Sequence, residues 1–406
     1  MRGDMRRYNR IVQVFFLILT TFYKTDGDCV LSLKNDFGEP SPVYVKNGTF
    51  LSSTTPTGDI LMRRSEKILV GCPGKNRYVV FGGDATDFEV AEVQCISDTI
   101  FRYGLWLGEF KDIRCNAPPW FTVEPNYTEC FGGRTLYKVG YQVGGEFLML
   151  YEACFDSQLL TTLYVRHELS PANSFYQRGV RRSQFIDTGL FGKYCIARLY
   201  STKNQRARFN DILGDRMDQR YITRNQFLTR GHLAPRVDFT LSALQRATFH
   251  YINAAPQWLR GNAGDWAALE DAVRRRAHSN GSRLVVYTGT HGVCTLADAH
   301  NEHHELFLHV DDNNNGIVPV PLYYYKVVYD PKKETAVAFV SINSPFYNRT
   351  MVDQLTFCDD ICDGNRNYSW LRWRPNDGTH SFCCDYEEFV KVVEHLPKLV
   401  VRDRFY

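Results

Sequence analysis

The sequence has little of what marks the special classes of protein. Neither sign of charge is in large excess, with 48 Lys and Arg residues against 45 Asp and Glu residues in a chain of 406. It has no low-complexity tract and no internal repeat. The longest apolar run, from Ile11 to Tyr23, has about 13 residues, and a membrane-spanning helix needs about 20. These absences favour a globular protein with one large core or two smaller ones.

Residues 1–27 have the pattern of a secretory signal. Arginines at positions 2, 6, 7 and 10 precede the apolar run, and the polar stretch from Lys24 to Gly27 follows it. The alternative is a membrane anchor, for which the run is short. Residues 1–27 hold five of the basic and two of the acidic residues, so the rest of the chain has 43 of each sign. Affinity for a polyanion must then come from local charge asymmetry.

Twelve cysteines lie beyond this segment, and an even number in a secreted chain predicts disulfides. Cys358, Cys362, Cys383 and Cys384 could instead bind zinc, but an oxidising compartment favours disulfides. The spacing does not determine the pairing. Five N-glycosylation sequons agree with a secretory route, at Asn47, Asn126, Asn280, Asn348 and Asn367.

The distribution of cysteines and of apolar patterns divides the rest of the chain into two regions. Residues 28–160 hold six of the cysteines and short β-rich runs, which predicts a small disulfide-rich β region without a catalytic constellation. Residues 161–406 have a mixed pattern, with strands expected at 227–229, 249–253, 282–289, 323–329 and 336–342. A helix is expected over 263–276, because Trp266, Leu269 and Val273 form one apolar stripe.

A basic segment runs from Arg166 to Arg236. It has 14 Lys and Arg residues against five Asp and Glu residues, a local excess of nine positive charges. Such a segment is usually a solvated face. Because it leads directly into the motif described next, we interpret it as a surface that binds phosphate groups.

The residues that carry chemistry lie between positions 229 and 270. An Arg-Gly-His tripeptide is followed by Asn-Ala-Ala-Pro-Gln, by a second asparagine and by Trp-Ala-Ala-Leu-Glu. A histidine can take a proton from water, an amide oxygen can bind a hard cation such as Mg²⁺, and a carboxylate can hold the waters of that cation. The set suits metal-assisted cleavage of a phosphodiester. Its members are Arg230, His232, Asn253, Asn262, Trp266 and Glu270.

This set resembles the DNA/RNA non-specific endonuclease family, the ββα-metal nucleases that include mitochondrial endonuclease G. The resemblance covers roughly residues 160–400 and is sharp from about 221 to 275. Trp258 and the secretory context make the salivary and digestive nucleases of arthropods, often called dsRNases, the most similar branch. The resemblance implies an α+β fold, with a ββα-metal motif on a central mixed or antiparallel sheet. It also implies secretion, into saliva or the gut lumen.

The resemblance further implies roles for single residues. His232 is expected to act as general base and Asn262 as the protein ligand of Mg²⁺, with Mn²⁺ as a second candidate. Glu270 lies about two helical turns after Asn262, so both side chains can face one cleft, and it is expected to hold the metal-bound waters. Arg230 and Arg274 are expected to bind the scissile phosphate, together with Arg236 as a further substrate contact. Arg274 lies four residues after Glu270 and could pair with it on one helix face. Asn253 is expected to be a supporting amide.

Thr229 departs from the family pattern, because many relatives have aspartate before Arg-Gly-His. This places the rate of turnover in question. The leading hypothesis is therefore an endonuclease that cuts DNA and RNA through phosphate contacts. The alternative is a secreted nucleic-acid-binding protein with the same fold and little or no catalysis. A weaker alternative is a ligand-binding or adhesion module in residues 28–160.

Several residues also allow a structural interpretation. Trp266 and Leu269 are expected in the core, and Trp258 is expected there rather than in a base-stacking platform. His303, His304 and His309 flank an apolar run and could suggest a metal, but alternation along a strand explains them better.

Overall fold

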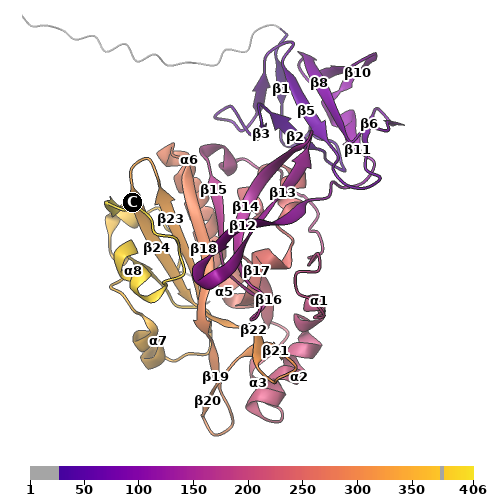
Figure 1. The fold of residues 1–406 in the computed structure, drawn as a ribbon. Coiled ribbons are helices and arrows are strands. Elements are labelled where there is room, and N and C mark those ends of the chain that lie inside the picture. Colours follow the sequence, from indigo (N-terminus) through magenta and orange to yellow (C-terminus); the bar gives the residue numbers. More distant parts are fainter. Residues whose placement is uncertain (1–26, 375–378) are drawn as a thin grey trace, which may run out of the picture.

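The computed structural model describes residues 27–374 and 379–406 (Figure 1). Apart from Gly27, the segment expected to be a signal lies outside the described residues. Within the described ranges, no helix combines the length and the apolar character needed to cross a membrane. A smaller β region, drawn in indigo and violet, sits at one end of a larger α+β body.

The N-terminal region contains three small antiparallel sheets. Two disulfides, Cys29–Cys95 and Cys72–Cys115, connect its strands and limit the freedom of the unfolded chain. The expected disulfide-rich β region is therefore confirmed. Its strands are β1 (Cys29–Leu31), β2 (Val43–Lys46), β3 (Thr49–Phe50), β4 (Ile60–Met62), β5 (Lys67–Gly71), β6 (Val79–Phe81), β7 (Asp84–Ala85), β8 (Val90–Ser97), β9 (Ile100–Tyr103), β10 (Trp106–Glu109) and β11 (Ile113–Cys115).

A nine-stranded sheet forms the centre of the larger body, in the order β12-β13-β14-β15-β18-β23-β24-β25, with β26 beside β24. Every pair is antiparallel except β24 with β26, as expected for a mixed or antiparallel sheet. Its strands are β12 (Thr122–Cys130), β13 (Arg134–Val143), β14 (Glu146–Asp156), β15 (Thr161–Leu169), β18 (Leu284–Val293), β23 (Pro321–Asp330), β24 (Thr335–Ile342), β25 (Ser381–Cys384) and β26 (Asp403–Arg404).

The domain boundary expected near residue 160 falls in the turn between β14 and β15, inside this sheet. Strands β12 to β14 are nine, ten and eleven residues long, longer than the N-terminal strands, but their sequences show the same β-rich pattern flanked by turns. That pattern shows the presence of strands but not the sheet in which each strand pairs. Cys130 and Cys154 form a third disulfide, which joins β12 to β14.

Both faces of the central strands are buried, which explains their nearly continuous apolar sequences. Tyr324 on β23 packs in the core with Trp266 and Leu269 of helix α6 (Asp265–Asn280). Its neighbour Tyr325 points to the other face and contacts Phe389 of helix α8 (Tyr386–Val392). Figure 1 shows α6 on one side of the sheet and α7 (Arg349–Leu355) with α8 on the other.

The remaining elements surround this sheet. The helices are α1 (Ile196–Leu199), α2 (Thr202–Leu213), α3 (Asp218–Tyr221), α4 (Ser242–Ala247), α5 (Leu259–Ala263), α6 (Asp265–Asn280), α7 (Arg349–Leu355) and α8 (Tyr386–Val392). Three two-stranded sheets are β16 (Leu228–His232) with β17 (Ala254–Trp258), β19 (Thr295–Ala297) with β20 (His303–Glu305), and β21 (Phe307–Val310) with β22 (Gly316–Pro319). The 3-10 turns are η1 (Phe110–Asp112), η2 (Phe131–Gly133), η3 (Pro171–Ser174), η4 (Arg236–Asp238), η5 (Tyr251–Asn253) and η6 (Arg366–Tyr368).

Candidate active site

A β-strand pair followed by a helix carries the motif residues. Strand β16 pairs antiparallel with β17, so that His232 lies opposite Ala254. The Tyr324 hydroxyl of the central sheet donates to the carbonyl oxygen of Ala255 at 2.7 Å, which fixes the pair on the sheet. Gly231 is required by space, because a Cβ there would overlap Gln257 and Tyr324. The ββα arrangement expected from the sequence is present.

Asn253 closes the connection between the two strands. Its side chain is fully buried, accepts from the Ala234 amide at 2.8 Å, and donates to the carbonyl oxygens of Ala234 and Thr248 at 3.0 Å each. The strand expected over 249–253 is wrong, because Tyr251–Asn253 form the turn η5 and the strand begins at Ala254. The imidazole of His250 accepts from the Ile252 amide, a local hydrogen bond that competes with strand pairing.

Asn262 and Glu270 lie on two helices rather than on one. Asn262 belongs to the short helix α5. The helical conformation is interrupted at Gly264 (φ −102°, ψ −114°), and Glu270 lies about one and a half turns into the next helix, α6. The two side chains nevertheless face the same space. The break lets α5 approach β16, where the Asn262 amide nitrogen donates to the Thr229 hydroxyl at 2.8 Å.

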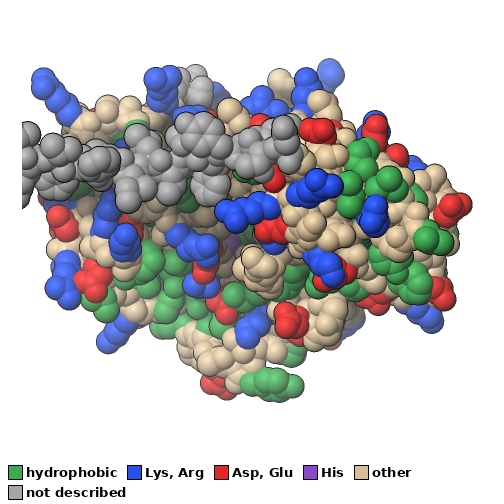
Figure 2. Space-filling view, turned by 90° about the horizontal axis from the view of Figure 1, so that it is seen from above, with side chains coloured by type: hydrophobic (Ala, Val, Ile, Leu, Met, Phe, Trp, Pro, Cys, Tyr) green, Lys and Arg blue, Asp and Glu red, His purple; other side chains and the backbone are tan. Residues whose placement is uncertain are grey.

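One cavity of about 990 Å³ brings together most of the expected site residues. His232, Asn262 and Glu270 line it, and so do three arginines, Arg182, Arg230 and Arg236. Lys and Arg side chains gather around the hollowed middle of the face shown in Figure 2. Arg182 was not singled out from the sequence; the only signal was its place in the Arg-x-x-Arg-Arg run of the basic segment.

His232 is held as a neutral imidazole. The ring packs against Phe185 and Phe249, with ring centroids 5.0 Å away in each case. Burial lowers the pKa of His232 to about 3, and the positive charges of Arg182 and Arg236 act in the same direction. Its Nε2 atom is buried and makes no hydrogen bond with the described residues. A neutral imidazole that faces a cavity can accept a proton.

Arg230 is positioned by aromatic rings before any ligand binds. Its guanidinium lies 5.2 Å from the ring centroid of Tyr200 and 5.6 Å from that of Tyr251. Its Nε donates to the Tyr251 hydroxyl at 3.0 Å. Arg236, on the other wall, donates to the carbonyl oxygen of Val180 at 3.0 Å. Both guanidinium groups therefore have fixed places on the cavity wall.

Arg274 lies elsewhere. Its side chain is only 5% exposed, is not part of the cavity lining, and donates to Asp238 at 2.7 Å and Asp271 at 3.0 Å. Its expected partner was Glu270. Asp238 also contacts Nε2 of the buried His167 at 2.9 Å. Arg274 therefore connects α6 to η4, the turn that begins with Arg236. It supports the cavity wall through this contact without lining the cavity itself.

Glu270 is half-buried at the cavity and has charged neighbours beneath it. Burial raises the pKa of its carboxyl group, and the ammonium of Lys326 acts in the opposite direction. Lys326 comes from β23, is 1% exposed, and donates to the Thr288 hydroxyl at 2.5 Å. Its ammonium lies 5.3 Å from the ring centroid of Trp266. A divalent cation near Glu270 would favour the ionised carboxylate.

The structural interpretations of the aromatic residues are confirmed. Trp258, Trp266 and Leu269 are at most 1% exposed and belong to the core. His303 and His304 lie on β20, and His309 lies on β21. His304 also approaches Asp298 and Glu302, a group outside the cavity whose ligand atoms lie within 4.8 Å of one another.

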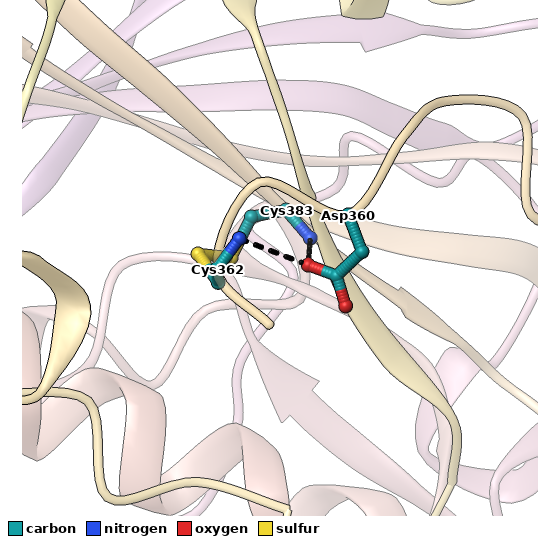
Figure 3. Close-up of side chains that lie close together, drawn as sticks. All are labelled: Asp360, Cys362 and Cys383. Atoms are coloured by element: carbon teal, nitrogen blue, oxygen red, sulfur yellow. Dashed lines mark hydrogen bonds between the residues drawn. A yellow bond between two sulfur atoms is a disulfide. The ribbon is translucent and has the colours of Figure 1, made fainter. Parts of the chain in front are cut away.

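The zinc alternative for the C-terminal cysteines is wrong. Cys358 pairs with Cys384 and Cys362 pairs with Cys383. Figure 3 shows Asp360 beside the second of these disulfides, where its carboxylate accepts from the amides of Cys362 at 3.2 Å and Cys383 at 3.1 Å. A sulfur in a disulfide is not a thiolate ligand. Ten of the twelve cysteines are paired; Cys195 and Cys294 are free.

The turn beneath the site should make the fold acid-sensitive. Burial lowers the pKa of His250 to about 4, against about 6.5 in an unfolded chain. As the pH falls below about 6.5, the imidazole of His250 is protonated in the unfolded chain but not yet in the folded one. The free energy of unfolding therefore decreases as the pH falls from about 6.5 to about 4. This single group should contribute about 2 kcal/mol of loss between pH 7 and pH 5. Denaturant unfolding at the two pH values measures it.

His250→Gln provides the comparison for this prediction. Glutamine does not titrate, so the variant should be less stable than the wild type at pH 7 but lose less stability on acidification. Equal losses for the two proteins would show that His250 does not contribute to the acid sensitivity.

The ββα unit therefore presents His232 to a cavity that three arginines also line. The model of the DNA/RNA non-specific endonuclease family matches residues 132–386. The chain belongs to this family of metal-dependent phosphodiester hydrolases.

The chain is similar to curated proteins and to solved structures, of which the following are examples. It is 32% identical to a salivary endonuclease of Lutzomyia longipalpis, over 89% of this chain and 83% of that protein. It is 22% identical to salivary protein Tsal2A of Glossina morsitans morsitans, over 92% of each chain, and 22% identical to a salivary endonuclease of Culex quinquefasciatus, over 82% and 85%. A chain of the crystal structure of the EndoG/EndoGI complex matches with 18% identity and a TM-score of 0.37, over 61% of this chain and 82% of that one.

Proposed function

We propose that the protein is a secreted, Mg²⁺-dependent endonuclease that hydrolyses DNA and RNA without sequence preference. The observation that carries this proposal is the single cavity that joins His232, Asn262 and Glu270 with three arginines. The similarity to salivary endonucleases and the five disulfides support secretion.

The proposed chemistry divides among these residues. His232 takes the proton of the attacking water. Arg230 and Arg236 hold the phosphate and balance the negative charge that grows on its oxygens. Arg274 positions η4 and α6 and does not touch the phosphate. The guanidinium groups meet phosphate oxygens, which all nucleic acids share, so neither the base nor the sugar is selected.

The residues present fit a hard divalent cation. Because the amide nitrogen of Asn262 donates to Thr229, its oxygen is the atom left to act as ligand. Glu270 would hold the waters of the cation rather than the cation itself. When bound, Mg²⁺ or Mn²⁺ would supply positive charge that polarises the phosphate.

Thr229 favours one competing function, binding of nucleic acid with little or no cleavage. In place of the expected carboxylate, the Thr229 hydroxyl donates to the carbonyl oxygen of Gln257 at 2.8 Å and accepts from Asn262. The hydroxyl thus orients the amide without adding negative charge. An oriented amide supports catalysis, so we place hydrolysis first.

Removal of divalent cations decides between the two functions. Purified protein should cut both plasmid DNA and long double-stranded RNA in Mg²⁺. It should cut neither in EDTA, and added Mg²⁺ or Mn²⁺ should restore cleavage. Gel electrophoresis of both substrates provides the measurement. Intact substrates in Mg²⁺ after long incubation, together with salt-sensitive binding, would instead establish the binding function.

A further inference from the structure

A second cavity lies where the N-terminal β region meets the larger body. Its volume is about 450 Å³. One wall comes from the loop between β1 and β2, which includes Lys34 and Glu39. The other wall comes from helix α4 and from the segment 177–183. The hydroxyl of Ser242 on α4 donates to the Glu39 carboxylate at 2.6 Å and so holds the two walls together.

The charge of this cavity is strongly positive. Lys34, Arg178, Arg181 and Arg246 line it, against one carboxylate, Glu39, which is already engaged by Ser242. Lys34, Arg178 and Arg181 are exposed. In a chain whose charges nearly cancel, four basic side chains around one hollow form a local site for an anion.

The second cavity adjoins the first along a fixed strip of chain. Ser183 lines both cavities; Arg181 borders the second and Arg182 borders the first. The strip is anchored at one end by Gln177, which accepts from the Ser242 amide at 2.6 Å. At the other end Ile186 donates to the carbonyl oxygen of Phe249 at 3.1 Å. The arginines of the strip therefore form a track from the catalytic cavity to the N-terminal region.

We propose that this second cavity binds the sugar-phosphate backbone of the same nucleic acid, several nucleotides from the scissile bond. The inference rests on the proposed function and gives the N-terminal region a role in substrate binding. Two contiguous cavities with basic walls suit a long polyanion better than a small one. Since the contacts are to phosphates, the subsite contributes affinity and salt dependence but no base preference.

The test uses the full chain with Lys34, Arg178 and Arg181 all changed to alanine. Binding of a duplex is measured by fluorescence polarisation in a His232→Ala background, without divalent cation, over a series of salt concentrations. The triple change should weaken binding about tenfold or more and lower the slope of log Kd against log salt by about 3. With His232 restored, loss of cleavage should be greater for a long duplex than for a dinucleotide, which is too short to reach the second cavity.

The matched control removes three basic side chains, Arg349, Lys391 and Lys398, on the α7 and α8 side of the sheet. All three are exposed, and this triple variant should bind the duplex like the parent. Unchanged duplex binding by the Lys34, Arg178 and Arg181 variant would overturn the inference. So would a loss confined to a sulfated polysaccharide such as heparin. Failure of the wild type to cut any substrate would count against the proposed function alone, because binding is measured without cleavage.

Discussion

His232→Ala should lower the turnover of plasmid DNA and of double-stranded RNA by about 10³-fold or more, while binding of either substrate changes little. His232 is the only histidine among the described residues that line the cavity. Burial and the nearby arginines lower its pKa, so that its imidazole is neutral at pH 7 and can accept a proton. Its loss removes the proton acceptor but none of the arginines that hold the phosphate. Single-turnover cleavage and fluorescence polarisation measure the two effects separately.

His303→Ala is the matched control for this change. His303 is an exposed histidine on β20 and does not line the cavity, so cleavage should be unaffected. If His232→Ala kept a tenth or more of the wild-type rate, a different group would have to act as base.

Asn262→Ala should raise the concentration of Mg²⁺ needed for half-maximal cleavage by more than about tenfold and lower the maximal rate by about 10²-fold. The amide oxygen is the one protein ligand proposed for the cation, so little else would hold it. Direct titration with Mn²⁺, followed by electron paramagnetic resonance, measures affinity without reference to activity.

Asn225→Ala is the control for Asn262, because Asn225 is an exposed amide in the loop before β16 and does not line the cavity. It should bind Mn²⁺ like the wild type. Equal Mn²⁺ affinity of Asn262→Ala and wild type would remove Asn262 as the ligand, whatever happened to the rate.

The sequence predicted the parts of the site that depend on local pattern. The order of strand, strand and helix could be read from the motif spacing and from the apolar stripe that includes Trp266 and Leu269. Trp258 was expected in the core rather than in a base-stacking platform, and it is fully buried. These features are encoded within about 40 residues of one another, where periodicity and turn residues are informative.

Side-chain partners that are distant in the sequence could not be predicted in this way. Arg274 was expected beside Glu270, but Asp238, 36 residues away, provides a buried carboxylate that already contacts His167. A buried guanidinium needs such a partner, and which carboxylate it meets depends on how η4 packs against α6. Arg182 was missed for the same reason, because nothing in the neighbouring sequence distinguishes it from the other arginines of the basic segment.

The interruption of the helix at Gly264 shows what the residue spacing could and could not predict. The residue spacing placed Asn262 and Glu270 two turns apart on one helix, and they do share a cavity. They do so from two helices, because the backbone of Gly264 is not helical and separates α5 from α6. Spacing alone thus identified the pair but not the backbone that presents it.

The most direct measurement is an anomalous difference map of crystals of the His232→Ala protein soaked in Mn²⁺. We expect one strong peak inside the arginine-lined cavity, within coordination distance of the Asn262 side-chain oxygen. A cavity without a peak, or a peak only at the group formed by Asp298, Glu302 and His304, would contradict it.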